Sequence, residues 1–403
     1  MSLTTTPAPA KRHPLTRGLV LMFAFCCGAI VANIYYAQPI VELIAPDLVL
    51  SAHSASLIVS LTQIGYALGL LFLVPLADLV ENRTLMIGTA LVASASLLAA
   101  GFSEHANAFL MISLLIGFSS VSVQMLVPLA AHLAPEESRG QVVGNIMGGL
   151  LLGILLARPL SSLVADHFGW RAVFMGAALI MLAIVVVLAL TIPKRTPDHQ
   201  SSYGQLLVSL LTLLRRHPVL RQRALYQGLL FAAFSLFWTA VPIELSRHFG
   251  LSQTQIALFA LVGAIGAIAA PIAGRLADAG HTRRASLVAL SLAPVAFLIG
   301  LSQLGYSVIG LAITGVLLDF AVQLNMVLGQ RAVYALDPAS RGRLNALYMT
   351  SIFLGGAIGS ALASALYEQQ GWHGVALVGA GLPLIALVMF LMVGRGGKAS
   401  SVA

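Results

Sequence analysis

Long apolar runs separated by short polar segments follow one another along the whole chain. Each run is near the roughly 20 residues that an α-helix needs to cross the hydrocarbon core of a bilayer. The pattern therefore predicts an all-α membrane protein with twelve transmembrane helices. We expect these helices at 18–43, 54–77, 84–103, 107–132, 141–164, 172–192, 223–246, 252–273, 284–303, 306–333, 344–367 and 374–394.

The composition supports the same class of protein. Hydrophobic residues make up 59% of the chain and charged residues 9%, with a mean hydropathy of +0.93, whereas a soluble domain has roughly 25% charged residues. The two cysteines, Cys26 and Cys27, are adjacent and form no structural cross-link, and no Cys/His spacing typical of a metal site occurs. We therefore expect neither a metal nor a cofactor.

Basic residues are divided unevenly between the two sides that twelve helices create. With both termini on one side, nineteen of the 22 Lys and Arg residues fall on that side, Arg171 and Arg247 fall on the other, and Arg158 lies within a span. Cytoplasmic loops of membrane proteins carry the excess of Lys and Arg, so we expect cytoplasmic termini in the inner membrane of a bacterium. Anionic membrane lipids then account for the net charge of +8 without a nucleic-acid partner.

The two halves of the chain repeat one another. The triplet Leu-Ala-Asp at 76–78 returns at 276–278, and the pair Gly-Trp at 169–170 returns at 371–372. Such a repeat predicts two pseudo-symmetric six-helix bundles with a substrate between them. We divide the chain into a cytoplasmic tail at 1–17, an N-terminal bundle at 18–192, a cytoplasmic linker at 193–222 that can hold an interfacial helix, a C-terminal bundle at 223–394, and a cytoplasmic tail at 395–403.

Small residues four positions apart mark one face of several spans. They occur in the second, fifth and eleventh spans, and as Gly263 and Ala267 in the eighth. This spacing lets helix backbones approach closely. Static packing explains any one of these pairs, whereas their joint occurrence favours a moving seam between the two bundles.

The segment after the second span resembles a family motif. It reads Val-Pro-Leu-Ala-Asp-Leu-Val-Glu-Asn-Arg at 74–83, and its copy at 274–284 reads Gly-Arg-Leu-Ala-Asp-Ala-Gly-His-Thr-Arg-Arg. Both are similar to the Gly-x-Leu-Ala-Asp-Arg-x-Gly-Arg-Arg loop of the major facilitator superfamily, although the first copy lacks both glycines. The resemblance covers all twelve spans and implies the major facilitator fold. It also implies a cytoplasmic latch of charge pairs and a helix terminus. The latch positions here are Asp78, Arg83, Gly274, Asp278 and Arg283.

The fifth span resembles the proton-coupled drug and sugar efflux branch of that superfamily, the drug:proton antiporters. In that branch, glycines are followed by a proline and then by Gly-Trp-Arg. Here the proline is Pro159 and the Gly-Trp-Arg lies at 169–171. Arg158 departs from the pattern. The stretch 33–39 is similar to a sugar-efflux subgroup, which does not identify a substrate. We expect a monomer that exchanges a small molecule for protons across the lipid bilayer.

Asp319 is the only carboxylate that the hydropathy pattern places deep within a span. An ionisable group at that depth is costly unless it is paired or beside a wet cavity, so it usually marks an ion, proton or substrate path. Arg158 is the only cation at comparable depth. We expect the two to couple protons, or alternatively sodium ions, to movement of the bundles. A fixed structural ion pair is the other interpretation.

Polar and aromatic side chains align along the first, fourth, seventh and tenth spans, which line the cavity in the family. Facing amides, hydroxyls and rings suit a small amphipathic or neutral polar organic solute. Any one of these amides can equally serve as a hydrogen bond between helices. The predicted substrate-binding residues are Asn33, Tyr36, Gln38, Gln124, Gln227, Phe231, Trp238, Gln323 and Asn325.

The favoured function is a secondary active transporter that exports its solute in exchange for protons. Proton-coupled uptake or facilitated diffusion is the alternative, because direction depends on which states bind proton and substrate. We expect no enzyme, since no His-Glu-x-x-His, Gly-x-Ser-x-Gly or metal-binding cluster occurs. A receptor without transport would not require the deep Asp319.

Overall fold

The computed structural model describes residues 16–197, 202–266, 268–303 and 306–399, and the regular structure in these ranges is helical. The predicted tails at 1–17 and 395–403 lie largely outside the described residues. The N-terminal bundle contains α1 Arg17–Ala32, η1 Gln38–Ile40, α2 Val41–Asp47, η2 Ala52–Ser54, α3 Leu57–Phe72, η3 Val74–Asp78, α4 Asn82–Phe102, α5 Ala106–Ser119, η4 Ser120–Ser122, α6 Val123–Leu133, α7 Arg139–Phe168 and α8 Trp170–Thr191. After α9 Tyr203–Arg216, the C-terminal bundle contains α10 Pro218–Arg247, α11 Gln253–Ala260, α12 Gly263–Gly266, α13 Ala269–Asp278, α14 Thr282–Leu301, α15 Val308–Tyr334, η5 Pro338–Ser340 and α16 Arg341–Ala399.

Ten helices of the described residues are long and apolar enough to cross a membrane, and the shorter apolar helix α1 precedes them. One of the ten, Pro338–Val393, consists of two helices joined at Gly371, whose φ of 62° and ψ of −158° are not helical. This backbone region is essentially restricted to glycine, so Gly371 ends one helix and begins the next. The all-helical membrane fold is confirmed, and twelve crossings remain a prediction.

The first span is interrupted, where the sequence predicted one helix over 18–43. α1 ends at Ala32, turns occupy 33–37, and η1 begins at Gln38. Pro39 explains the interruption, because a proline lacks a backbone N–H and its ring collides with the carbonyl four residues earlier. Ser161 of α7 donates a 2.5 Å hydrogen bond to the carbonyl of Tyr36 in this break.

The expected eighth span is also divided, into α11, α12 and α13. Backbone N–H groups around the divisions bond three residues back rather than four, as from Val262 to Phe259 at 3.0 Å and from Ile265 to Val262 at 3.1 Å. Such tighter turns within a span mark a locally irregular helix. The irregular stretch lies against α15.

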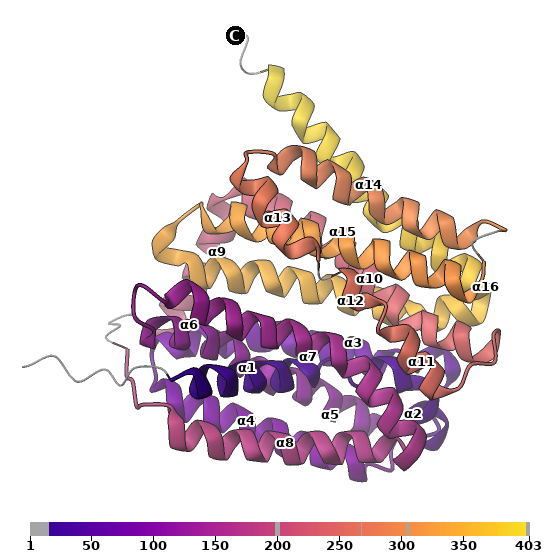
Figure 1. Ribbon diagram of the computed structural model, residues 1–403, viewed down its shortest axis with the longest axis horizontal. Coiled ribbons are helices and arrows are strands. Elements are labelled where there is room, and N and C mark those ends of the chain that lie inside the picture. The colour runs from indigo at the N-terminus through magenta and orange to yellow at the C-terminus, as the bar shows by residue number, and fades with distance from the viewer. Residues whose placement is uncertain (1–15, 198–201, 267, 304–305, 400–403) are drawn as a thin grey trace, which may run out of the picture.

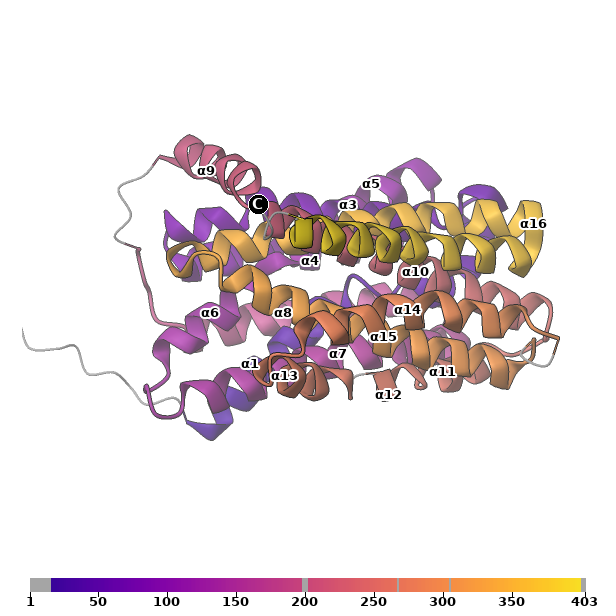
Figure 2. The same ribbon diagram turned by 90° about the horizontal axis from the view of Figure 1, so that it is seen from above.

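The two bundles lie one above the other in Figure 1, with the N-terminal bundle in indigo to magenta and the C-terminal bundle in orange to yellow. Across the boundary, α3 packs against α16 and α7 packs against α11. α9 lies at the end of the molecule where α1 begins, on the left of Figure 2. We call this end the linker side and the other end the opposite side.

Close helix contacts recur at equivalent places in the two bundles. A Cβ on Gly28 of α1 would lie 2.5 Å from the oxygen of Gly149 of α7. In the second bundle, a Cβ on Gly355 of α16 would lie 2.1 Å from the oxygen of Gly228 of α10. The first and fifth spans therefore touch as the seventh and eleventh do, which is the geometric counterpart of the sequence repeat.

The helices that small residues mark do line the boundary between the bundles, as predicted, and their movement stays a prediction. The glycines of these pairs, however, pack within each bundle. A Cβ on Gly65 of α3 would lie 1.9 Å from the oxygen of Leu114 of α5, and Gly153 of α7 meets α1, so both pack within their own bundle. Ala267, the partner expected for Gly263, lies outside the described residues. α3, α7, α11 and α16 do line the boundary, but other side chains meet there. Small-residue spacing predicts a close approach without specifying the neighbouring helix.

Gly117→Ala should destabilise the protein, because a Cβ there would lie 1.8 Å from the carbonyl oxygen of Thr62 on α3. Overpacking of about 1–3 kcal/mol should lower the unfolding temperature in detergent by about 5 °C. The matched control is Gly148→Ala, where nothing lies within 4 Å of the added Cβ and helix propensity favours alanine. Equal unfolding temperatures for the two variants, followed by tryptophan fluorescence, would contradict the packing.

Candidate functional site

Asp319 lies about halfway along α15 and faces α10 and α12. The residue is 9% exposed, and its Oδ1 accepts a 2.7 Å hydrogen bond from Nε1 of Trp238 on α10. A Cβ on Gly266 would lie 2.4 Å from Asp319 Cβ, and one on Gly263 would lie 2.7 Å from Oδ2. The carboxylate therefore occupies space that the two glycines of the irregular eighth span leave free.

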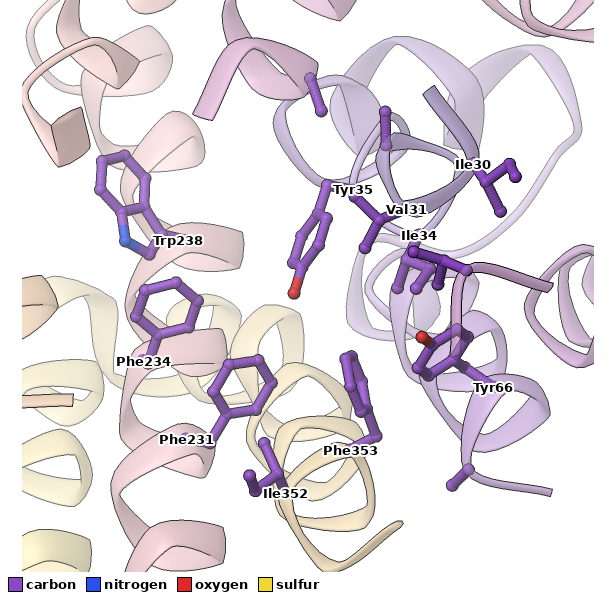
Figure 3. Close-up of a cluster of buried hydrophobic side chains, with 14 of the residues drawn as sticks. Ile30, Val31, Ile34, Tyr35, Tyr66, Phe231, Phe234, Trp238, Ile352 and Phe353 are labelled. Atoms are coloured by element: carbon purple, nitrogen blue, oxygen red, sulfur yellow. The ribbon is translucent and has the colours of Figure 1, made fainter. Parts of the chain in front are cut away.

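Arg158 of α7 reaches the same region from the other bundle. It is 4% exposed, and its Nε donates a 2.7 Å hydrogen bond to Oε1 of Gln38. Its guanidinium carbon lies 4.8 Å from the ring centre of Trp238, 5.1 Å from that of Tyr35 and 5.2 Å from that of Phe234. Figure 3 shows Trp238 and Phe234 on α10, with Tyr35 of the N-terminal bundle beside them. Aromatic faces at these distances attract a cation.

Within the described ranges, no ion pair joins Arg158 to Asp319. Trp238 contacts both, because its ring faces the guanidinium while its N–H donates to the carboxylate. Gln38 adds a second connection, since its amide N–H donates to Oγ1 of Thr239 on α10 at 3.1 Å while its oxygen accepts from Arg158. We call Gln38, Arg158, Trp238 and Asp319 the central site.

Four predicted substrate residues form hydrogen bonds between elements of their own bundle. Asn325 of α15 donates to Gln227 of α10 at 2.7 Å, and both residues are fully buried. These two amides therefore hold α10 against α15 in this conformation. The other two bonds run from Asn33 to Ser120 at 3.4 Å and from Gln124 to Tyr66 at 3.1 Å.

Phe231, another predicted substrate residue, belongs to an aromatic cluster. Phe231 stacks on Phe234 with ring centres 5.0 Å apart, and the edge of Phe353 from α16 approaches Phe231 at 5.5 Å. We call these three rings, which Figure 3 labels, the aromatic wall. Tyr36 and Gln323 are half-buried. A role in substrate binding stays a prediction for all of them.

The sequence patterns missed several residues that connect the two bundles. Gln63 of α3 donates to Ser235 of α10 at 3.0 Å and accepts from Ser360 of α16 at 3.1 Å. Ser60 of α3 donates to the carbonyl of Ala357 at 2.7 Å. An amide in the middle of an apolar span was an available signal for Gln63. Serines are common in transmembrane helices and carry little such information.

On the opposite side, charged residues join the bundles. Arg247 at the end of α10 pairs with Glu42 of α2 at 2.7 Å and also with Glu368 of α16. Thr254 of α11 donates to Asp166 of α7 at 2.5 Å. The first and last of these contacts cross the boundary between the bundles and hold this side closed.

Glu244 lies one turn before Arg247 and is 2% exposed. It accepts hydrogen bonds from Tyr306 and from Tyr367, the latter at 2.6 Å. Burial, and then the hydrogen bond to Glu244, raise the pKa of the Tyr306 hydroxyl. Both tyrosines belong to the C-terminal bundle, so Glu244 stabilises that bundle rather than the boundary.

On the linker side, Asp278 at the end of α13 pairs with Arg331 of α15 at 2.6 Å. Arg331 also donates to the carbonyl of Gly274 at 3.0 Å. The sequence motif did not single out Arg331, because it lies more than fifty residues further along the chain. The pair joins two helices of the same bundle.

The other predicted latch residues also contact their own bundle or solvent. Side-chain hydrogen bonds between the helices of the two bundles lie, in the part of the chain that is described, at the level of the central site or nearer the opposite side. The conformation is therefore closed on the opposite side, with the latch not engaged across the boundary. Asp78 is exposed, Arg83 donates to the carbonyl of Ala189, and Arg283 lies 5.5 Å from the ring centre of Phe390.

The family model described as Major Facilitator Superfamily matches residues 20–236 and residues 223–402. The first match covers the N-terminal bundle, α9 and the first part of α10, the second covers the C-terminal bundle from within α10, and together they cover nearly the whole chain. The chain therefore belongs to the Major Facilitator Superfamily.

Two bacterial relatives match along most of their length. "Uncharacterized transporter YgaY" of Escherichia coli O157:H7 is 41% identical over 382 residues, which are 94% of this chain and 96% of the relative. "Probable transporter SCO4007" of Streptomyces coelicolor is 33% identical over 397 residues, 94% of this chain and 92% of the relative. With the fold described above, these matches make the chain a membrane transporter of the superfamily.

Solved structures share the fold at low identity. A mutant of the nucleoside transporter NupG has a TM-score of 0.72 and 15% identity, over 93% of this chain and 99% of that one. A bacterial homolog of the human lysosomal transporter Spinster, in an inward-facing and occupied conformation, has a TM-score of 0.70 and 15% identity. The match covers 95% of this chain and 98% of that one. At these identities the likeness concerns the fold alone.

Arg247→Gln should loosen the opposite side, because it removes the ion pair to Glu42 that crosses the boundary. A cysteine at Ser60, with Cys26 and Cys27 replaced by Ala, should react with a maleimide about two- to fivefold faster, as expected for an exposed ion pair. Arg171→Gln is the control, since Arg171 bonds within the N-terminal bundle. Equal labelling rates in the three backgrounds would show that Arg247 does not hold this side closed.

Proposed function

We propose that this protein is a proton-coupled secondary transporter that moves a small amphipathic organic solute by alternating access between its two bundles. The observation that carries the proposal is the position of Asp319, a buried carboxylate that accepts a hydrogen bond from Trp238, the residue whose ring contacts Arg158 of the other bundle. Asp319 and Arg158 come from different bundles and meet through Trp238. With the two charges placed in this way, the free energy of contact between the bundles depends on whether Asp319 carries a proton.

The coupling follows from electrostatics at short range. An ionised Asp319 attracts the Arg158 cation in the other bundle, and this attraction is stronger in a low-dielectric interior than in water. A proton on Asp319 removes it. The relative stability of the two bundle arrangements then differs between the protonated and ionised states, which is the linkage that a proton-driven cycle requires.

Export in exchange for protons is the direction that the resemblance of the fifth span favours. In this proposal the linker side faces the cytoplasm, in agreement with the distribution of Lys and Arg. The solute enters between the bundles and contacts the aromatic wall and the half-buried Tyr36 and Gln323. Closure of the linker side by the latch residues then accompanies opening of the other side.

Proton-coupled uptake is a second candidate, and one observation favours it. Nη2 of Arg158 is buried and has no hydrogen-bond partner in the described residues. A cation in that state favours a negatively charged solute. Such a solute binds together with a proton rather than in competition with it.

Asp319→Asn should abolish pH-driven accumulation of solute, because the amide cannot take up and release a proton. Solute binding and passive exchange should survive, since Asn keeps the size and can still accept from Trp238. The measurement uses proteoliposomes with an imposed pH gradient, an internal fluorescent pH reporter and a panel of amphipathic solutes. Glu104→Gln, at an exposed loop position, is the control. Undiminished uphill transport by Asp319→Asn would place the proton elsewhere.

Asp78→Ala and Asp278→Ala should each slow transport while solute affinity stays within about threefold. The latch biases the equilibrium between conformations and does not touch a ligand at the central site. Transport rate and affinity are measured separately, in proteoliposomes and in detergent. Glu137→Ala, another exposed carboxylate on the linker side, should change neither. Complete loss of binding in a folded variant would argue against a latch.

A further inference from the structure

Arg158 is incompletely bonded for an arginine at its depth. A guanidinium offers five N–H donors, yet in the described residues only Nε finds an acceptor, Oε1 of Gln38. Nη2 is buried without a partner. Removing such a cation from water is costly unless its donors are paired, and the cost is greater at membrane depth. Contacts with three rings offset part of this cost, but they leave the outer edge of the guanidinium without an acceptor.

The described residues do not supply the missing acceptor in this conformation. The side chains packed on the guanidinium are Gln38, Tyr35, Phe234 and Trp238, and none of them is an anion. Asp319 accepts instead from Nε1 of Trp238, on the other side of the indole contact. Arg158 is therefore a cation with free donors between the bundles of a transporter.

We propose that Arg158 binds the carboxylate of an organic monoanion, the transported solute, and that the aromatic wall holds the apolar body of that anion. This inference rests on the proposed function in its uptake form, in which the solute and the proton bind together, and it names the substrate class of the same site. A carboxylate is planar and matches the guanidinium with two parallel hydrogen bonds. A single deep cation fits a single negative charge. Phe231, Phe234 and Phe353 supply apolar surface beside it.

Asp319 sets the strength of this binding. An ionised Asp319 and a bound carboxylate are both attracted to Arg158 and repel one another. Neutralising Asp319 therefore strengthens carboxylate binding, and by reciprocity a bound carboxylate favours the protonated Asp319. Gln38 bonds both Arg158 and Thr239 of the other bundle, so an anion that reorients Arg158 also acts on the boundary.

The test measures binding to the purified full-length protein in detergent at one pH. The probes are two matched pairs, phenylacetate with phenylacetamide and hexanoate with hexanamide, and the readouts are tryptophan fluorescence and the shift in unfolding temperature. Each pair differs in charge while its apolar body is the same. We expect at least one acid to bind about tenfold to a hundredfold more tightly than its amide, as charge-assisted hydrogen bonds to a buried cation imply.

Variants assign the preference to Arg158. Arg158→Gln should remove the preference for the acid, and Arg158→Lys should retain only part of it, because lysine keeps the charge without the planar fork. Asp319→Asn should bind the acid about fivefold or more tightly than the unchanged protein. Arg171→Gln, whose arginine bonds within the N-terminal bundle away from the central site, should leave all affinities unchanged.

Several outcomes would overturn the inference. These are equal binding of acid and amide in both pairs, no binding of any probe, a preference that persists in Arg158→Gln, or weaker acid binding in Asp319→Asn. If Arg158→Gln does not fold, the affinity of Asp319→Asn for the acid tests the inference instead, because Arg158 is intact in that variant. Proton flux is a separate readout. An acid preference without proton-coupled transport would overturn the proposed coupling and leave the carboxylate site in place.

Discussion

The structure depends on keeping one buried cation stable between two bundles that have to move. Arg158 is nearly inaccessible and has no ion-pair partner in the described residues, so neutral groups make its direct contacts. Three aromatic faces and the Gln38 oxygen surround it. Each of these contacts has a local structural cause. The break caused by Pro39 brings Gln38 to the guanidinium, and α10 presents its rings on one face.

The same region determines how the bundles can separate. Hydrogen bonds between the bundles cluster from the central site toward the opposite side, whereas Asp278 and Arg331 bond within one bundle. A boundary that is closed at one end and, in the part of the chain that is described, free of such bonds between the bundles at the other is one of two related arrangements in an alternating-access cycle. Most of these boundary bonds join neutral side chains, each worth about 1 kcal/mol. Bonds of that strength can be exchanged during a cycle, whereas a large apolar contact would hold one arrangement.

Sequence patterns predicted the fold and the two deep charges, because both leave strong one-dimensional signals. Apolar length, the repeated Leu-Ala-Asp triplet and the rarity of charge in a span require no knowledge of neighbours. The predictions that were wrong or incomplete concern which helix or side chain each residue contacts. Glycine spacing did not reveal that Gly65 meets α5 rather than the other bundle, and the motif did not reveal that Arg331 pairs with Asp278. Gln227 and Asn325 were predicted to bind substrate, but they bond to each other in this conformation. The sequence cannot distinguish an amide that faces a ligand from one that faces a partner helix.

The arrangement around Trp238 bears on whether the two deep charges form a fixed structural pair. A fixed pair is stable in a membrane when the ions touch and their remaining donors and acceptors are satisfied. Here an indole ring contacts both groups, and Nη2 of Arg158 has no acceptor among the described residues. Charges that interact through an intervening ring gain or lose attraction when either bundle shifts, whereas a touching pair would resist separation. A buried cation with unpaired donors contributes little to holding helices together. Its energy does change directly when Asp319 takes up a proton or an anion binds beside Arg158. The geometry therefore favours a site that responds to its occupants over one that only holds the helices together.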